Sequence, residues 1–367
     1  TVENMVIYPH GAAARRPGTQ YVSSVKTPAN KTRLIPFEFS TTQTYILELG
    51  NQYIRFYKDN GQILSVGSPY EISSPYLTAE IFDIKFAQSA DVMYVTHPNH
   101  KTRKLSRTGH TSWTLTEVDF VNGPYLDTNS STTTITASAH TVGTGRTFTA
   151  SANIFVSTDV GRLVRFRDGY AEITGFTSAT VVTVEILKDT GSTSGSTDWS
   201  LGAFSSTTGH PSCVSFFEQR LVFAATLNNP QTVYFSKSGD YENMDANIGG
   251  TVADDDAIIY TIASNQVNAI RFMAAGRTLI IGTAGGEFTV SGGGDNDAVT
   301  PTNILIKKQS NHGAANTDAI AVANATLFLQ RAKRKIRELA YNFDVDGYTA
   351  PDLTILAEHI TEGGIVE

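Results

Sequence analysis

The sequence predicts an all-β fold, a β-propeller-like core of repeated antiparallel blades with one small inserted β domain. Three observations lead to this prediction. Short apolar runs bounded by Gly, Asn, Asp and Pro recur along the 367 residues, whereas helical spacing is nearly absent. A three-strand unit repeats along the chain, and one Ser/Thr-rich stretch interrupts that repeat.

The strand pattern is clearest where alternating or apolar runs end at turn residues. Residues 33–39, 53–57 and 221–225 are examples, and Asp59-Asn60-Gly61 after one such run is typical of a hairpin turn. Residues 330–341 have a loose helical spacing, but the run just before them has the character of a buried strand. We therefore predict a hairpin in that region.

The repeated unit consists of a strand, a short turn, an apolar strand, a polar loop and a further strand. The first strands of the five units are separated by four intervals. Each interval is about 50 residues, once an insertion of about 80 residues is removed from the longest, and propeller blades have similar periods. Each first strand carries one anchor residue: Phe39, Phe86, Phe217, Phe272 and Val322.

The insertion is recognised by its composition. Residues 126–208 are rich in Ser and Thr and contain strand-like runs at 163–167, 171–176 and 181–187. The predicted organisation is an N-terminal segment with the first blades in residues 1–125, the inserted β domain in 126–208 and further blades in 209–367. Because the chain starts at Thr1 rather than at Met, and its last residues, 363–367, have the pattern of a further strand, we expect it to be incomplete at both ends.

Composition excludes several classes of protein. The 28 Lys and Arg against 35 Asp and Glu give a net charge of −7, which argues against a basic groove that binds nucleic acid tightly. A single cysteine, Cys213, cannot form an intrachain disulfide, and its apolar neighbours predict a buried core position. No apolar run is long enough to span a membrane.

No motif indicates catalysis, a cofactor or a resident metal, so we predict a non-enzymatic protein without catalytic, cofactor-binding or metal-binding residues. The sequence contains no His-Glu-x-x-His, Cys-x-x-Cys or Gly-x-Ser-x-Gly motif. The clusters Asp254-Asp255-Asp256 and Asp295-Asn296-Asp297 lack the spaced ligands of a calcium loop, and we interpret them as solvated loop charges.

Several segments resemble the tail nozzle proteins of short-tailed bacteriophages, also called tail tubular protein B-like proteins. The N-terminal Tyr8-Pro9-His10-Gly11 continues through Arg15-Arg16-Pro17-Gly18 and is followed by the strand at 33–40, a pattern similar to the start of that family. The middle segments Phe217-Glu218-Gln219-Arg220-Leu221 and Ser236-Lys237-Ser238-Gly239-Asp240-Tyr241 resemble the middle of the same family. Residues 159–163 and 177–182 are similar to its inserted module.

This resemblance implies a structural virion protein of the phage tail, made in the host cytoplasm. Its expected partners are five further copies in a homo-hexameric ring, the adaptor and tail-fibre proteins, and double-stranded DNA that passes during genome ejection. A conduit should not retain DNA, so we expect loop carboxylates to face the lumen. The expected lumen-facing residues are Asp254, Asp255 and Asp256, and the expected subunit contacts or turns are Arg15, Arg16, Pro17, Gly18, Ser238, Gly239, Asp240 and Tyr241.

Two other functions are compatible with a propeller. One is a glycosidase or depolymerase, which needs two carboxylates about 5–10 Å apart in a pocket. The other is a carbohydrate-binding or host-adhesion module, which exposed aromatic residues clustered within residues 148–176 of the insertion would favour.

Overall fold

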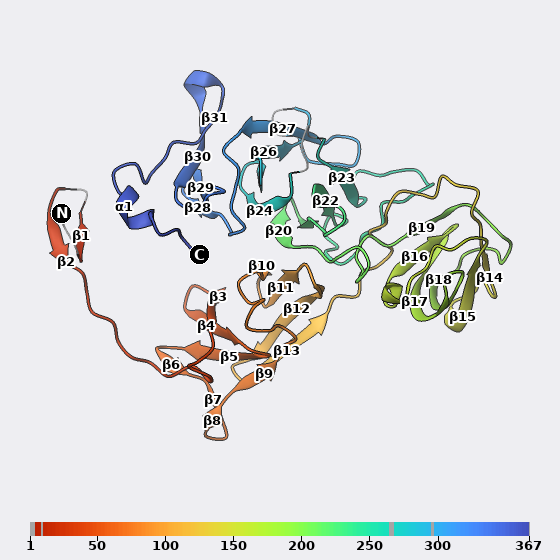
Figure 1. Cartoon of the computed structure of the whole chain (residues 1–367), viewed down its shortest axis with the longest axis horizontal. Helices are drawn as coiled ribbons and strands as arrows, with labels where there is room; N and C mark the ends of the chain where they lie inside the picture. Colours follow the sequence, from red (N-terminus) through yellow and green to blue (C-terminus); the bar gives the residue numbers. More distant parts are fainter. Residues whose placement is uncertain (1–3, 9, 264–267, 295–296, 367) are drawn as a thin grey trace. The chain divides into compact units, whose positions relative to one another are not determined.

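The computed structural model describes the chain except residues 1–3, 9, 264–267, 295–296 and 367 (Figure 1). The described residues form strands and turns, together with a four-residue helix α1 (Glu358–Thr361) and the 3-10 turns η1 (Ser157–Asp159) and η2 (Phe343–Val345). No helix in this described part is long and apolar enough to cross a membrane. The chain divides into two compact units, residues 1–81 with 109–112 and residues 82–108 with 113–367.

The main antiparallel sheet of the first unit has the order β3-β4-β5-β6, with β9 paired to β5, and β1-β2 and β7-β8 form two-stranded antiparallel sheets. Strand β3 alternates buried and exposed residues, and Phe37 and Tyr45 face each other in the core. Asp59 and Asn60 both have positive φ, so the hairpin turn predicted there is confirmed. The strands of this unit are β1 (Met5–Ile7), β2 (Ala13–Arg15), β3 (Arg33–Ser40), β4 (Gln43–Gly50), β5 (Tyr53–Lys58), β6 (Gly61–Gln62), β7 (Leu64–Ser65), β8 (Ser68–Pro69) and β9 (Glu71–Ser73).

The second unit contains four four-stranded antiparallel sheets, each a meander in chain order, which we call blades I to IV. Blade I is β10 (Lys85–Ser89), β11 (Val92–His97), β12 (His100–Gly109) and β13 (Ser112–Glu117), and blade II is β20 (Cys213–Phe217), β21 (Arg220–Ala224), β22 (Thr232–Phe235) and β23 (Ile258–Thr261). Blade III is β24 (Ile270–Ala275), β25 (Leu279–Thr283), β26 (Gly286–Ser291) and β27 (Leu305–Ser310), and blade IV is β28 (Ile320–Val322), β29 (Ala325–Leu329), β30 (Ile336–Asn342) and β31 (Gly347–Thr349).

The predicted fold class is confirmed, since the chain is all-β and consists of repeated antiparallel blades of propeller type. The five anchor residues of the predicted repeat lie in β3, β10, β20, β24 and β28, each of which is the first strand of its own sheet. The hairpin predicted at 330–341 is also confirmed, because Leu329 at the end of β29 pairs with Ile336 at the start of β30.

The core of the second unit lies between consecutive blades. Strand β21 is buried along its whole length. Its successive side chains point to opposite faces, so both faces must be covered. Leu221 and Phe223 pack with Tyr94 of blade I, whereas Val222 and Ala224 pack with blade III. Blade II is therefore covered on both faces, as expected of blades that stack face to face.

Cys213 lies in the core between blades II and III, with 1% of its surface exposed. Burial raises the pKa of its thiol, so the group stays protonated and inert at neutral pH. The prediction of a buried core cysteine is confirmed.

The Ser/Thr-rich stretch folds into a six-stranded sheet in the order β14-β15-β18-β17-β16-β19. This sheet has a hydrophobic cluster of its own that includes Phe148, Phe166 and Ile173. The division of the chain after Ile81 places the sheet in the second unit, and its independence as a domain with bounds 126–208 stays a prediction. Its strands are β14 (Ile135–Ala137), β15 (Gly143–Ala150), β16 (Leu163–Phe166), β17 (Gly169–Ser178), β18 (Val181–Lys188) and β19 (Trp199–Leu201).

Candidate functional site

The first group of predicted contact residues lies near the N-terminus. Arg15 ends β2, and Arg16, Pro17 and Gly18 continue as exposed, irregular chain outside any turn. The structure therefore places these residues on an accessible surface. Their role in a subunit contact stays a prediction.

The second predicted group forms a tight turn after β22. Lys237 and Asp240 pair across the turn, and Ser238 and Gly239 occupy its tip. Gly239 has a φ of +74°, a conformation that favours glycine over other residues. Its backbone N–H donates a 2.8 Å hydrogen bond to the carbonyl of Gln219, which holds this turn against the turn between β20 and β21.

Arg220 links this turn to the predicted acidic cluster. Its side chain is buried, with 2% exposed, at the start of β21. The guanidinium donates to the carbonyls of Ser236 at 2.7 Å, Asp256 at 2.6 Å and Asp254 at 2.6 Å. The network therefore joins strand β21, the end of β22 and the loop that leads into β23. Burial lowers the pKa of Arg220, which remains a cation at neutral pH.

The acidic cluster is only partly available to a lumen. Asp254 and Asp255 are exposed, but Asp256 is buried with 3% exposed. The Asp256 carboxylate accepts from the Lys237 ammonium at 2.8 Å and from the Ala253 N–H at 2.8 Å. The expectation that Asp256 faces a lumen is therefore corrected, because its carboxylate fixes the loop from within. That Asp254 and Asp255 face a lumen stays a prediction.

Next to this network, a groove of about 460 Å³ opens where the first turns of three blades meet. Gln88 and Ser89 come from blade I, and Ala275, Gly276 and Arg277 come from blade III. Blade II supplies the middle of the groove. Its lining residues from that blade are Phe216, Phe217, Glu218, Gln219 and Tyr241. Tyr241 is the predicted contact residue that the structure brings into this groove, which is our candidate functional site.

Contacts between aromatic rings, together with one ion pair, support the wall of the groove. The Phe216 ring lies edge to face with Tyr241 at 5.0 Å between centroids and with Tyr94 at 6.0 Å. The Tyr94 hydroxyl donates to Glu242 at 3.0 Å, and the Lys104 ammonium binds the same carboxylate at 2.7 Å. Burial, together with the Glu242 charge, raises the pKa of Tyr94, which therefore remains a neutral donor.

The carboxylates around the groove are engaged in holding the fold. Glu242 binds Lys104 and Tyr94, and Glu218 accepts a 2.7 Å hydrogen bond from the Val299 N–H. These contacts hold the two carboxylates in place beside the aromatic and polar groups that line the groove.

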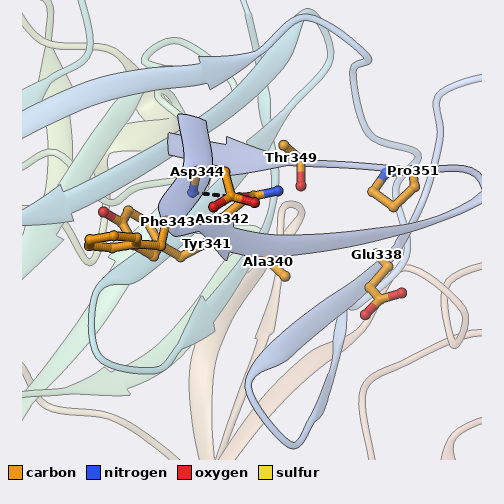
Figure 2. Close-up of a pocket in the computed structure, with 8 residues that line it drawn as sticks. All are labelled: Glu338, Ala340, Tyr341, Asn342, Phe343, Asp344, Thr349 and Pro351. Atoms are coloured by element: carbon orange, nitrogen blue, oxygen red, sulfur yellow. Dashed lines mark hydrogen bonds between the residues drawn. The ribbon is translucent and has the colours of Figure 1, made fainter. Parts of the chain in front are cut away.

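A second hollow, of about 390 Å³, lies on blade IV (Figure 2). Asn342 accepts a 2.9 Å hydrogen bond from the Asp344 N–H, which shapes the turn η2 beside the hollow. Tyr341 and Phe343 are 52% and 85% exposed, so this hollow borders an accessible apolar surface. Its lining residues are Glu338, Ala340, Tyr341, Asn342, Phe343, Asp344, Thr349 and Pro351.

The aromatic residues that a carbohydrate-binding insertion would expose are largely internal. Phe148, Phe155 and Phe166 are buried in the core of the six-stranded sheet, and Phe176 is 38% exposed. The alternative of an aromatic sugar-binding platform within residues 148–176 therefore fails for the three buried rings, which provide packing.

Comparison with known proteins gives few results. No family model and no curated protein matches this chain. Among solved structures, a protein from Lactobacillus plantarum is similar over 85% of this chain and 82% of its own, with 9% identity and a TM-score of 0.38. YCF48 from Cyanidioschyzon merolae is similar over 88% of this chain and 85% of its own, with 9% identity and a TM-score of 0.37. With TM-scores this low, neither similarity bears on what this chain does.

Proposed function

We propose that this chain is a structural, non-enzymatic subunit of the distal tail tube, or nozzle, of a short-tailed bacteriophage. In this role, copies of the chain assemble into a ring, usually of six, that contacts the adaptor and tail-fibre proteins and conducts double-stranded DNA during ejection. The proposal rests on the resemblance of its sequence segments to that family. The observation that carries it furthest is that two of these segments meet in the network around Arg220.

The network suits a subunit whose shape must persist while DNA passes. Arg220, Lys237 and Asp256 direct their charged groups at backbone and at one another, and this arrangement fixes one end of blade II. Hydrogen bonds from charged groups are among the stronger ones in proteins, and a buried network with its members satisfied favours one rigid arrangement.

The net charge of −7 supports the same role. Each phosphate that a protein neutralises adds to non-specific DNA affinity and slows sliding, so a conduit benefits from few available cations. Asp254 and Asp255 are exposed and would repel phosphates if they face the lumen. A lumen lined mainly by Arg15, Arg16, Lys333 and Arg334 in a solved assembly would refute this part of the proposal.

The experiment is negative-stain imaging of the purified chain, combined with mass measurement by light scattering. We expect sixfold rings. We propose that the exposed apolar surface of blade IV is buried between neighbouring subunits, so Phe343→Asp should shift the population towards monomers by placing a charge there. Val142→Asp is the control, since Val142 is also exposed, at 62% against 85% for Phe343, and directly precedes β15 of the inserted sheet.

Monodisperse monomers that cleave polysaccharide would overturn the proposal in favour of a propeller glycosidase. If the rings of both variants dissociate equally, the proposed ring assembly is supported, but the assignment of blade IV to the contact between subunits is refuted.

A further inference from the structure

The N-terminal hairpin β1-β2 has an apolar face that the rest of the described chain leaves accessible. Residues directly opposite each other in an antiparallel pair lie on the same face, and here Met5 pairs with Arg15. Ile7 pairs with Ala13 on that same face. The face therefore presents three apolar side chains and one guanidinium. Met5 is 45% exposed and Ile7 is 68% exposed, so solvent reaches much of this apolar surface.

The hairpin is attached to the rest of the chain by a linker only. Among the described residues, its backbone hydrogen bonds join positions 4–16 to one another. The residues that follow, 16–22, form no helix or strand, and a linker of this length can extend to about 25 Å. The chain is held to the main sheet of the first unit at Lys26, whose N–H donates to the buried Glu48 carboxylate at 3.2 Å. An isolated two-stranded hairpin is at best marginally stable in water, so this one gains stability when a further surface covers it.

The hollow on blade IV has the complementary character (Figure 2). Tyr341 and Phe343 border it with exposed rings. Glu338 and Asp344 contribute two carboxylates to its lining. Within the part of the chain that the structure describes, neither carboxylate forms an ion pair, and nor does the Arg15 guanidinium. Opposite charges beside an apolar contact favour one orientation of the two surfaces.

We infer that the β1-β2 hairpin of one copy docks into the blade IV hollow of a second copy. The apolar face of the hairpin packs against Tyr341 and Phe343. Arg15 binds the carboxylates of Glu338 and Asp344 beside that contact. The hairpin and the hollow are different surfaces, so the contact is head-to-tail, and its repetition produces a closed ring or a filament. The inference rests on the proposed assembly of several copies and names the element that covers blade IV.

The test is disulfide cross-linking of two variants of the full chain that are co-expressed, one of them tagged, and oxidised with copper phenanthroline. Ala13→Cys places a thiol on the apolar face of the hairpin, and Thr349→Cys places one in the hollow. Val142→Cys replaces Thr349→Cys in the control, because Val142 is exposed but lies outside the hollow. The native Cys213 is 1% exposed and stays unreactive while the chain is folded, which circular dichroism verifies.

We expect Ala13→Cys and Thr349→Cys to give a cross-linked dimer that contains both chains, at a yield at least about tenfold above that with Val142→Cys. Ile7→Asp in the Ala13→Cys chain should lower this yield about tenfold or more, because it places a charge in the apolar contact. Leu64→Asp should leave the yield unchanged. Leu64 is 53% exposed on the other two-stranded hairpin, β7-β8, and is therefore a matched site for the added charge.

A yield no higher than that of the control, or equal effects of the two aspartate variants, would refute the docking. A double variant, Ala13→Cys with Thr349→Cys, that cross-links only within single chains would refute it too, because each hairpin would then cover its own blade. Sixfold rings without the cross-link would refute the docking and keep the proposed ring. Cross-linked copies without sixfold rings would support the docking and count against the nozzle.

Discussion

The network around Arg220 makes a strong prediction about stability. In Arg220→Met, the side chain keeps much of its length and apolar contact but loses all its donors. The carbonyls of Ser236, Asp254 and Asp256 then lack the hydrogen bonds that they accept at 2.6–2.7 Å in the native chain.

The expected cost follows from this geometry. A buried polar group left without a partner costs about 1–3 kcal/mol, and three carbonyls are affected here. Water can reach part of the loop, because Asp254 is exposed, so the sum is discounted. We expect a loss of about 3–5 kcal/mol in the local opening free energy. At about 1.4 kcal/mol per factor of ten, this is a loss of roughly a hundredfold or more in amide protection.

The assay is native-state hydrogen exchange by mass spectrometry over residues 217–257. Arg334→Met is the matched control, since Arg334 is exposed on blade IV and its change should stay within about 0.5 kcal/mol. Arg220→Lys should fall between the two, because one ammonium cannot span the carbonyls that a planar guanidinium reaches. Protection in Arg220→Met equal to that of Arg334→Met would refute the reasoning.

Two further predictions concern single groups. Burial lowers the pKa of His210 to about 4, whereas the unfolded value is about 6.5. The unfolded chain therefore binds more protons than the folded chain between these pH values. The free energy of unfolding should fall by about 3 kcal/mol as pH drops from 6.5 to 4. Thermal unfolding across this pH range should show a flatter slope in His210→Gln than in the exposed-site control His359→Gln, and equal slopes would contradict the assignment. Gly239→Ala should cost about 1–2 kcal/mol because its φ of +74° is strained for alanine, whereas Gly18→Ala should be close to neutral in the same melting experiment, and two equal melting temperatures would show that the turn tolerates a side chain.

Much of the fold can be predicted from sequence because blade strands carry local signals. An apolar strand that is buried on both faces, such as β21, reads as an unbroken apolar run, and positive-φ turns such as the one at Asp59 and Asn60 select their residues strongly. The division into compact units after Ile81 has no such signal, since it depends on which surfaces pack rather than on any residue type.

The site is less predictable for a physical reason. The acceptors of Arg220 are backbone carbonyls 16 to 36 positions further along the chain, and a carbonyl has the same chemistry at every residue. An arginine at the start of an otherwise apolar strand is the one available signal, since it must find partners when buried. The misplacement of Asp256 has the same origin, because its partner Lys237 is a distant residue and three adjacent aspartates give no indication of which one turns inward.

The same geometry changes what the net charge means. Arg220, Arg162 and Lys85 are buried, and each is committed to carbonyl or carboxylate partners inside the second unit. Lys237 and Lys104 are paired with Asp256 and Glu242. The number of cations available to phosphates is therefore smaller than the 28 in the sequence, while the net charge stays at −7 because each ion pair also takes up a carboxylate. Since non-specific affinity for DNA scales with the phosphates that a surface can neutralise, internal pairing of cations weakens retention without any change in composition. If the chain has the proposed nozzle role, arginines that hold its own loops give it both the rigidity and the low DNA affinity that such a role requires.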